Sequence, residues 1–349
     1  MKRISLISVA IVIGSLIACS LTSCKKKEGE YTPEKGKGRI SKVYYEHYGV
    51  YVNSGQKFTT VPKKLVEVWK WDKNKLMQIE SKNEYGQKWA LNFIYKGKQV
   101  TKIESGDMVF NFTYTEKDTK LKKIEILNEE AKPQLNITID DRSGDKVSKL
   151  TYEYFTYIDV PEKSLVSKMR PVMNIMLGDN LGEVVLKDVE NTAKTHKATK
   201  TEKTTVQVVL TYNGNNVSEE ARTIFKEGAT TQTQTARYAH DNKSNPYYHA
   251  FCMIFDGYYN TTAQNPGMNA YFASFSENNI MSYVVCQPTI NNPKKVEDTI
   301  DIAEYFYKYN GDNFPTERDK VKFIPDKYGD SSRNQTEHII YYYEYVPKK

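Results

Sequence analysis

The chain has 349 residues, of which 50 are Lys or Arg and 43 are Asp or Glu, so its formal net charge at pH 7 is +7. Because the charges are interspersed and not gathered in blocks, this excess is typical of a solvated surface, and we expect no nucleic acid as a partner. The 27 Tyr and 13 Phe favour β-sheet over a helical bundle, and the length suffices for one large domain with its own core.

Residues 1–23 have the features of a bacterial lipoprotein signal peptide. Lys2 and Arg3 precede an apolar run that ends at Ile17, which is short for a membrane-spanning helix of ~20 residues. The sequence Leu-Thr-Ser-Cys that ends at Cys24 fits a lipobox, in which the cysteine is acylated and becomes the new first residue. We therefore expect acyl chains such as palmitate on Cys24 to hold the protein on a membrane surface. A plain signal peptide and an uncleaved membrane helix are the alternatives.

The residues after the lipobox indicate where the protein is attached. No Asp follows Cys24, so the inner-membrane retention signal of enteric bacteria is absent, and we expect an outer membrane lipoprotein. Whether it faces the periplasm or the cell surface is left open. Residues 24–38 are polar, with Gly and Pro, and read as a flexible tether. Residues 39–349 are then predicted to be a single domain, with a glycan or an envelope protein as a candidate partner beside the membrane.

A hairpin pattern recurs along the first half of that domain. In residues 89–95 every second position is Trp, Leu, Phe or Tyr, which places these side chains on one face of a strand. Gly97 follows and can take the positive φ that a tight turn needs. Residues 68–80 and 110–125 repeat the same order of strand, turn and strand. The sequence therefore predicts a mainly β fold, an antiparallel meander of hairpins.

The return strands of these hairpins share a pair of aliphatic residues three positions apart. The pairs are Leu76 with Ile79, Val100 with Ile103, Leu121 with Ile124, and Val147 with Leu150. In a regular strand an offset of three points to opposite faces. We predict that a bulge re-aims the first residue of each pair, or that this residue caps the turn.

Residues 161–178 interrupt the strands. Apolar side chains recur there at three- and four-residue spacings from Leu165 to Met176, which suits one face of a helix that Pro171 kinks. We expect one short inserted helix. Strand patterns return at 206–212, 303–309 and 339–345.

Together these features resemble a family of secreted lipoproteins of unknown function, common in Bacteroidota and described as having a porin-like fold. The resemblance rests on the lipobox at Cys24, on the hairpin motif from Tyr95 to Ile103, and on three later blocks. These are Asp241 to Tyr247, Ser276-x-Asn278-Asn279, and the segment from Phe314-Pro315-Thr316 to Tyr343-Glu344-Tyr345. It implies a curved sheet or a closed, porin-like barrel, and it carries over no catalytic residue.

The sequence contains no recognisable catalytic or metal-binding signature. Gly-x-Ser-x-Gly, His-Glu-x-x-His, Cys-x-x-Cys and phosphate-binding glycine loops are all missing, so we expect no enzyme, no cofactor and no metal. His240 and Asp241 could orient each other as a general base, but a histidine in an Asn-rich loop is the preferred interpretation. Cys252 and Cys286 are an even pair in an oxidising compartment and are disulfide candidates; two separate buried thiols are the alternative.

Trp69, Trp71 and Trp89 form a possible aromatic binding face. On an exposed sheet they would stack on sugar rings, whereas in a core they would bury apolar area. We prefer the core, because the alternation continues from Trp89 into Leu91 and Phe93. The expected function is therefore a non-catalytic envelope lipoprotein with a binding or structural role. A carbohydrate-binding surface lipoprotein and a hydrolase with an unrecognised site are the alternatives.

Overall fold

The computed structural model describes residues 38–73, 75–82, 86–97, 99–106, 108–115, 120–144, 146–156, 202–226, 229–247, 276–288, 297–324 and 334–347. The chain divides into two units, Met1–Tyr31 and Thr32–Lys349, and all the described residues belong to the second. Cys24, the tether and the helix expected at 161–178 lie outside them. Within the described ranges, no helix is both long enough and apolar enough to pass through a membrane.

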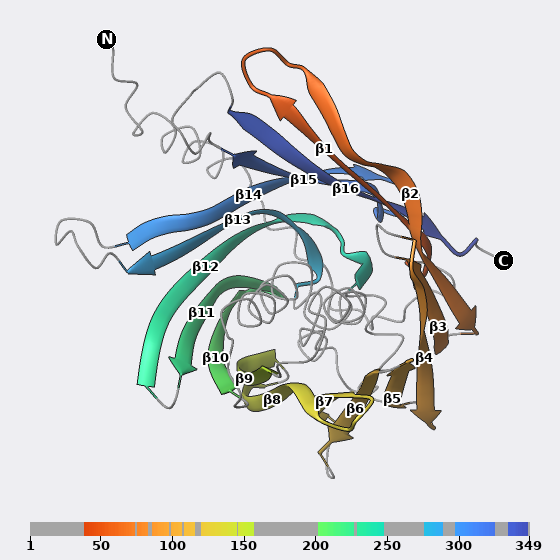
Figure 1. The fold of residues 1–349 in the computed structure, drawn as a ribbon, viewed down its shortest axis with the longest axis vertical. Coiled ribbons are helices and arrows are strands. Elements are labelled where there is room, and N and C mark those ends of the chain that lie inside the picture. The colour runs from red at the N-terminus through yellow and green to blue at the C-terminus, as the bar shows by residue number, and fades with distance from the viewer. Residues whose placement is uncertain are drawn as a thin grey trace. The chain divides into compact units, whose positions relative to one another are not determined.

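The described residues form a closed barrel of 16 antiparallel strands (Figure 1). The strands are β1 Ile40–Tyr51, β2 Lys57–Asp72, β3 Lys75–Lys82, β4 Lys88–Lys96, β5 Gln99–Ser105, β6 Met108–Tyr114, β7 Leu121–Asn128, β8 Pro133–Ser143, β9 Lys146–Thr156, β10 Glu202–Asn213, β11 Asn216–Lys226, β12 Ala229–Ser244, β13 Asn278–Pro288, β14 Glu297–Tyr309, β15 Pro315–Ile324 and β16 Gln335–Tyr345. Each strand pairs with its neighbours in sequence, and β1 pairs with β16 to close the ring. The predicted mainly β, antiparallel fold is confirmed, and of the two forms left open the closed barrel is the one observed.

The inner face of the barrel is mainly apolar. Tyr247, just after β12, contacts Trp69 of β2 at 6.5 Å and Tyr343 of β16 at 6.0 Å between ring centroids. Because β12 and β2 are far apart in the strand order, the contact between Tyr247 and Trp69 crosses the interior. Trp69 and Tyr247 belong to one buried cluster that includes residues of β1 to β11 and β16. Strands β1 to β11 and β16 therefore all contribute inward side chains to a common core.

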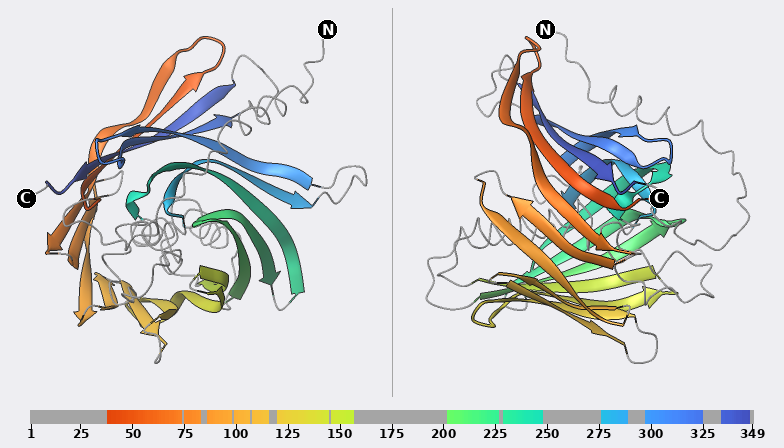
Figure 2. Two further views of the ribbon diagram at one scale, coloured as in Figure 1. Left: turned by 180° about the vertical axis from the view of Figure 1, so that it is seen from behind. Right: turned by 90° about the vertical axis from the view of Figure 1, so that its right-hand side faces the viewer.

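The outer face carries charges arranged as cross-strand and same-strand ion pairs. These pairs include Lys42–Glu344, Lys70–Glu80, Lys102–Glu104, Lys123–Glu125, Lys203–Glu153, Arg237–Glu219 and Lys308–Glu317. Single exposed apolar side chains, such as Val209, Phe306 and Phe323, stand among them. The two further views in Figure 2 show the strands inclined to one another around the ring, as the twist of an antiparallel sheet requires.

A bulge next to the turn occurs in each hairpin for which an aliphatic pair at offset three was predicted. The register shifts where Lys70 and Trp71 face β3, where Ile94 and Tyr95 face β5, where Thr113 and Tyr114 face β7, and where Asp141 and Arg142 face β9. The extra residue brings both members of each pair to the buried face: Leu76 and Ile79, for example, are each 0% exposed. The predicted bulge is confirmed. Gly97 has φ 63° at its turn, also as predicted.

Side chains near the turns form hydrogen bonds to the backbone of the preceding hairpin. The Tyr95 hydroxyl at the end of β4 donates to the carbonyl oxygen of Leu76 at 2.9 Å, and the Tyr114 hydroxyl donates to that of Val100. Arg142 Nη2 donates to the carbonyl oxygen of Leu121 at 2.7 Å in the same way. Because a bulge takes backbone groups out of the regular ladder, these donors satisfy carbonyls that the bulge exposes. We call this series of contacts the turn zipper.

The turn zipper continues where the ring closes. Trp71 Nε1 donates to the carbonyl oxygen of Ile40 at 2.7 Å, and the Tyr345 hydroxyl donates to that of Pro315 at 2.6 Å. The backbone N–H of Val346 donates to the carbonyl oxygen of Arg39 at 2.8 Å. The first and last described strands are therefore joined as firmly as consecutive ones.

Candidate functional site

Sequence blocks that carried the family resemblance meet at one end of β12, β13 and β14. Asp241 Oδ1 accepts hydrogen bonds from the backbone N–H groups of Lys243 at 2.9 Å and Asn279 at 3.0 Å. Its Oδ2 accepts one from Asn279 Nδ2 at 3.2 Å and one from the Tyr309 hydroxyl. The Asp241 carboxylate therefore joins β12, where it lies, to the start of β13 and the end of β14.

Asn245 turns the chain from the end of β12 toward the interior. Its Oδ1 accepts the backbone N–H of Tyr247 at 3.1 Å, a local turn typical of Asn, and its own N–H donates to the carbonyl oxygen of Glu277 at 3.0 Å. Tyr247 is directed inward by this turn and is 5% exposed. The Asn-rich motif therefore places a tyrosine inside the barrel.

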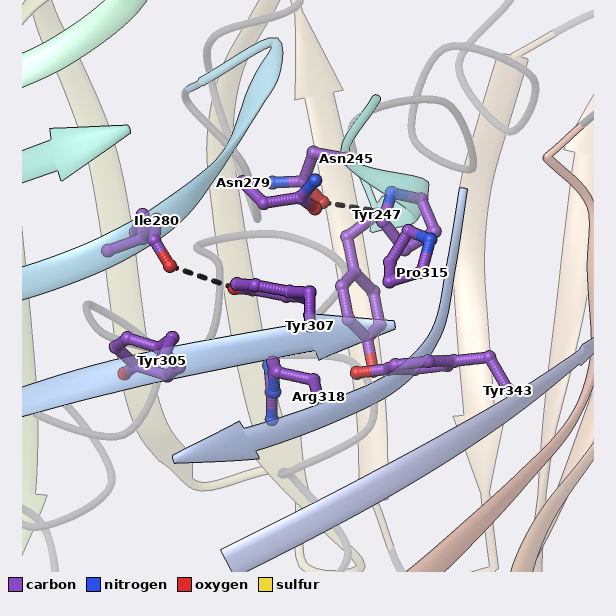
Figure 3. Close-up of a pocket in the computed structure, with 10 residues that line it drawn as sticks. Asn245, Tyr247, Asn279, Ile280, Tyr305, Tyr307, Pro315, Arg318 and Tyr343 are labelled. Atoms are coloured by element: carbon purple, nitrogen blue, oxygen red, sulfur yellow. Dashed lines mark hydrogen bonds between the residues drawn. The ribbon is translucent and has the colours of Figure 1, made fainter. Parts of the chain in front are cut away.

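A small cavity lies beneath this turn (Figure 3). The space open to the centre of a water molecule is about 20 Å³, little more than one ordered water requires. Its lining comes from the motif segments and from β13 to β16. The lining residues are Asn245, Pro246, Tyr247, Asn279, Ile280, Tyr305, Tyr307, Pro315, Arg318 and Tyr343.

Arg318 is the charged group that lines the cavity, and it is only 4% exposed. Its guanidinium lies 4.5 Å from the ring centroid of Tyr341 and 6.0 Å from that of Tyr305, and it hydrogen-bonds Tyr343. Pro315 and Arg318 repeat the offset of three seen in the other hairpins, after a register shift between Lys308 and Tyr309. A cation thus occupies a position that holds Ile or Leu in four other hairpins and the buried Glu220 on β11.

The tyrosines of the cavity are neutral hydrogen-bonding groups. Burial raises the pKa of Tyr343, although the Arg318 guanidinium opposes this shift. Burial also raises the pKa of Tyr247 and of Tyr307 well above the ordinary value. The Tyr307 hydroxyl donates to the carbonyl oxygen of Ile280 at 2.9 Å. These hydroxyls therefore stay protonated near pH 7 and act as hydrogen-bonding groups.

Two lysines extend the positive charge along the inner face of β15. Lys320 Nζ lies 5.2 Å from the ring centroid of Tyr283, and Lys322 Nζ lies 5.7 Å from the same ring. Both lysines are half-buried. Glu337 of β16 stands opposite Lys322 in the register and contacts His47 Nε2 at 2.9 Å. We call Arg318, Lys320 and Lys322 the basic row.

A second buried charge cluster lies on β11. Glu220 and Arg222 are both 2% exposed and bond each other, and the second Glu220 oxygen accepts the Tyr238 hydroxyl at 2.6 Å. Burial raises the pKa of Tyr238, with the Glu220 carboxylate adding to the shift. Because cation and anion neutralise each other, we interpret this cluster as part of the barrel's core and not as a binding site.

A Thr, His and Asp group on the outer face has the distances of a hydrolase triad. His338 Nδ1 lies 2.9 Å from Asp319 Oδ2, and its Nε2 lies 3.2 Å from Thr336 Oγ1. Acyl transfer also needs N–H donors for the oxyanion. β16 is paired on both sides, with β1 and β15, so its backbone N–H groups are engaged in ladders. β16 therefore offers no unpaired N–H group for an oxyanion, and we interpret these three side chains as a hydrogen-bonded contact between β15 and β16.

The three tryptophans singled out in the sequence are on the inner side. Trp69 is 4% exposed, and Trp71 and Trp89 are partly buried against the same core. The Trp69 and Trp71 rings stack at 6.2 Å, and Trp69 Nε1 donates to Glu67 Oε2 at 2.8 Å. They present no exposed row of coplanar rings.

The remaining sequence candidates are not brought together. Cys286 is buried, while Cys252 lies outside the described residues, so their pairing stays a prediction. The oxygens of Asp241 are held by the motif contacts given above. Burial lowers the pKa of His240 to about 4, and its Nε2 is buried with no hydrogen-bond partner among the described residues. Within the described ranges no three His, Cys, Asp or Glu side chains are grouped as metal ligands.

The described residues thus define a class of protein, a 16-stranded antiparallel barrel with a mainly apolar interior, a charged exterior and a basic row on the inner face of β15. No protein-family model matches the chain, and no curated protein matches it. Among solved structures, it is similar to the crystal structure of a porin-like protein from Bacteroides uniformis ATCC 8492, with a TM-score of 0.43 and 10% identity over 88% of this chain and 97% of that one. The barrel assignment rests on the strand pairing of this chain alone.

Proposed function

We propose that the protein is a non-catalytic lipoprotein, held on the outer membrane by acylated Cys24, whose barrel stands in water and binds a ligand in its interior. The observation that carries this proposal is the outer face of the barrel, which carries ion-paired charges around the ring, while the buried cluster inside is mainly apolar.

A barrel that crosses a membrane has the opposite polarity, because its outward residues contact lipid. Each Lys or Arg on that face costs about 2–4 kcal/mol at the bilayer midplane. Here Lys70, Lys123 and Lys203 all point outward from different parts of the ring. A water-facing barrel agrees with this surface, and a lipid anchor would then supply the membrane attachment.

The chemistry of the cavity supports binding over catalysis. Burial keeps the hydroxyls of Tyr247 and Tyr307 protonated, so they are not suited to move a proton near neutral pH. The inward position of Trp69, Trp71 and Trp89 gives no support to sugar stacking on an outer aromatic face.

Substitution of the expected lipidation site tests the proposal. The full-length chain and its Cys24→Ser variant are expressed in a bacterium with a lipoprotein pathway and labelled with palmitate. Cys24→Ser should lose the label and leave the membrane fraction without detergent, while Cys19→Ser, in the expected signal segment, should keep both properties. A Cys24→Ser protein that still needs detergent to stay in solution would show that the barrel itself is embedded.

A further inference from the structure

We propose that residues 157–201, which lie outside the described ranges, dock on the inner face of the barrel and make its interior a packed core instead of an open channel. The inference goes beyond the binding role given above and does not depend on it. If both hold, the ligand of that role would contact this segment as well as the barrel wall.

The first argument is that wall side chains alone cannot fill a ring of this size. With strands about 4.8 Å apart and tilted by about 40°, a closed ring of 16 strands is about 30 Å across between backbones, whereas two facing sheets fill the space between them only at about 10 Å. Yet the inward residues of β4 to β8 are each 0% exposed: Leu91, Val100, Phe110, Ile124 and Leu135. A group other than the wall and other than water therefore covers them.

The second argument is the set of polar atoms that the covering group has to satisfy. Ser81 Oγ, Trp89 Nε1 and Ser105 Oγ are buried on the inner face, with no hydrogen-bond partner among the described residues. They lie on the adjacent strands β3, β4 and β5, and Ser81 is directly opposite Trp89. Hydrocarbon, such as a lipid chain, would leave all three atoms unsatisfied, which is unfavourable. A polypeptide has backbone donors and acceptors and can cover apolar and polar groups together.

The third argument is that these polar atoms lie where one long segment leaves the barrel. Ser81 is near the end of β3, Trp89 is near the start of β4, and Ser105 ends β5, so all three are at the end of the barrel away from the turn zipper. β9 ends and β10 begins at that same end, where Thr156 stands opposite Glu202.

The chain between Thr156 and Glu202 is far longer than a hairpin needs. Two residues are enough to join antiparallel strands whose ends face each other, but 45 residues join these two. Of the 30 residues from 160 to 189, 14 are Val, Ile, Leu or Met, which suits a segment that covers apolar side chains. Residues 248–275, which follow β12 at the turn-zipper end, are the alternative occupant.

Photo-cross-linking in intact cells tests the inference. Cells that express the full-length chain are grown with photo-methionine, a diazirine analogue close in shape to Met, and irradiated, and the cross-linked peptides are identified by mass spectrometry. Met108, which is opposite Ser105 and 2% exposed, should cross-link to residues 157–201. Met77, 40% exposed on the outer face of β3, is the control within the same molecule and should form no such cross-link.

A shortened variant measures how well the inner face is covered. Replacing residues 157–201 with Asn-Gly joins β9 to β10 by a tight turn, and circular dichroism checks that the strands persist. All three tryptophans of the chain are on the inner side, so acrylamide should quench their fluorescence several-fold more in this variant. The control shortens residues 325–333, between β15 and β16, to Gly-Ser and should leave the quenching unchanged, because Ile324 already lies opposite Gln335.

The inference is overturned if Met108 forms no cross-link to residues 157–201, whether it captures residues 248–275, a lipid, another protein or only the barrel wall. It is also overturned if the shortened barrel folds and its quenching equals that of the parent. If the shortened chain does not fold, the cross-link in the parent chain decides alone. None of these results depends on Cys24, so a failure of lipid anchoring is recognised separately by palmitate labelling.

Discussion

Two adjacent glutamates on β11 show that the contribution of an ion pair to stability depends on which face of the barrel it lies on. Glu219 faces outward and pairs with Arg237 at 3.1 Å, with side chains 40% and 49% exposed. Glu220 faces inward and pairs with Arg222, both 2% exposed. Exposed pairs contribute little because water screens them, whereas removing one member of a buried pair leaves an uncompensated charge in the core.

We therefore expect Glu220→Ala to lower the free energy of unfolding by about 3–5 kcal/mol. Glu219→Ala should lower it by less than about 1 kcal/mol. Urea unfolding followed by tryptophan fluorescence measures both variants. Equal effects would mean that the inner pair is hydrated in solution.

His240 links stability to pH. Burial lowers its pKa in the folded state from 6.5 to about 4, so between these values the unfolded chain binds more protons than the folded one. Stability from this residue is complete above pH 6.5 and is lost as the pH falls toward 4, by about 2–3 kcal/mol.

His240→Gln should therefore flatten the dependence of unfolding free energy on pH between 7 and 4.5, measured by urea titration at each pH. The carboxylates titrate in both proteins, so the difference between the two curves isolates the histidine. Parallel curves would show that His240 is exposed to water.

At the scale of the hairpin, the sequence predicted the alternating strands, the turn at Gly97 and the bulges of the first hairpins. It predicted them because the aliphatic pairs recur with the same offset. The same offset joins Pro315 and Arg318, but a proline and a charged residue hide the repeat. Testing the offset at every turn, whatever the residue type, would have pointed to Glu220 and Arg318, where a charged residue takes the place of an aliphatic one.

The turn zipper makes neighbouring hairpins depend on one another. Tyr95→Phe removes the donor to the carbonyl oxygen of Leu76 and should cost about 1–3 kcal/mol, since that carbonyl is then buried without a partner. Tyr44→Phe is the control, because its hydroxyl bonds the exposed Glu344 and water can replace it. Thermal unfolding of both variants checks the prediction; equal shifts in Tm would argue against the zipper.

At the scale of the whole molecule, the sequence left the choice between an open sheet and a barrel undecided. Closure depends on the pairing of β1 with β16, whose residues lie some 300 positions apart, as in Tyr44 opposite Tyr342. No local pattern encodes such a pairing. The basic row was missed for a related reason: which face of β15 points inward becomes visible only when the ring is complete.

Closure also brings the two ends of the described barrel together, at Arg39 and Val346. A chain in which a short linker joins Pro347 to Gly38, with new ends at the Gly106 turn, should keep the near-UV circular dichroism of the parent barrel. Its Tm should be within several degrees of the parent. New ends placed inside β8 should abolish folding, because they interrupt two ladders. If both permutants are unfolded, the pairing of β1 with β16 does not form in solution.

The turn zipper has a consequence for how such proteins change over time. Each hairpin of the zipper brings one donor for the unit before it, and its first aliphatic residue leaves one acceptor for the unit after it. If a hairpin were duplicated in tandem at a turn, the copy would therefore find a matching acceptor in the hairpin before it and a matching donor in the hairpin after it. Lineages of this architecture should vary in circumference by steps of two strands, with the bore widening or narrowing while the joints stay the same.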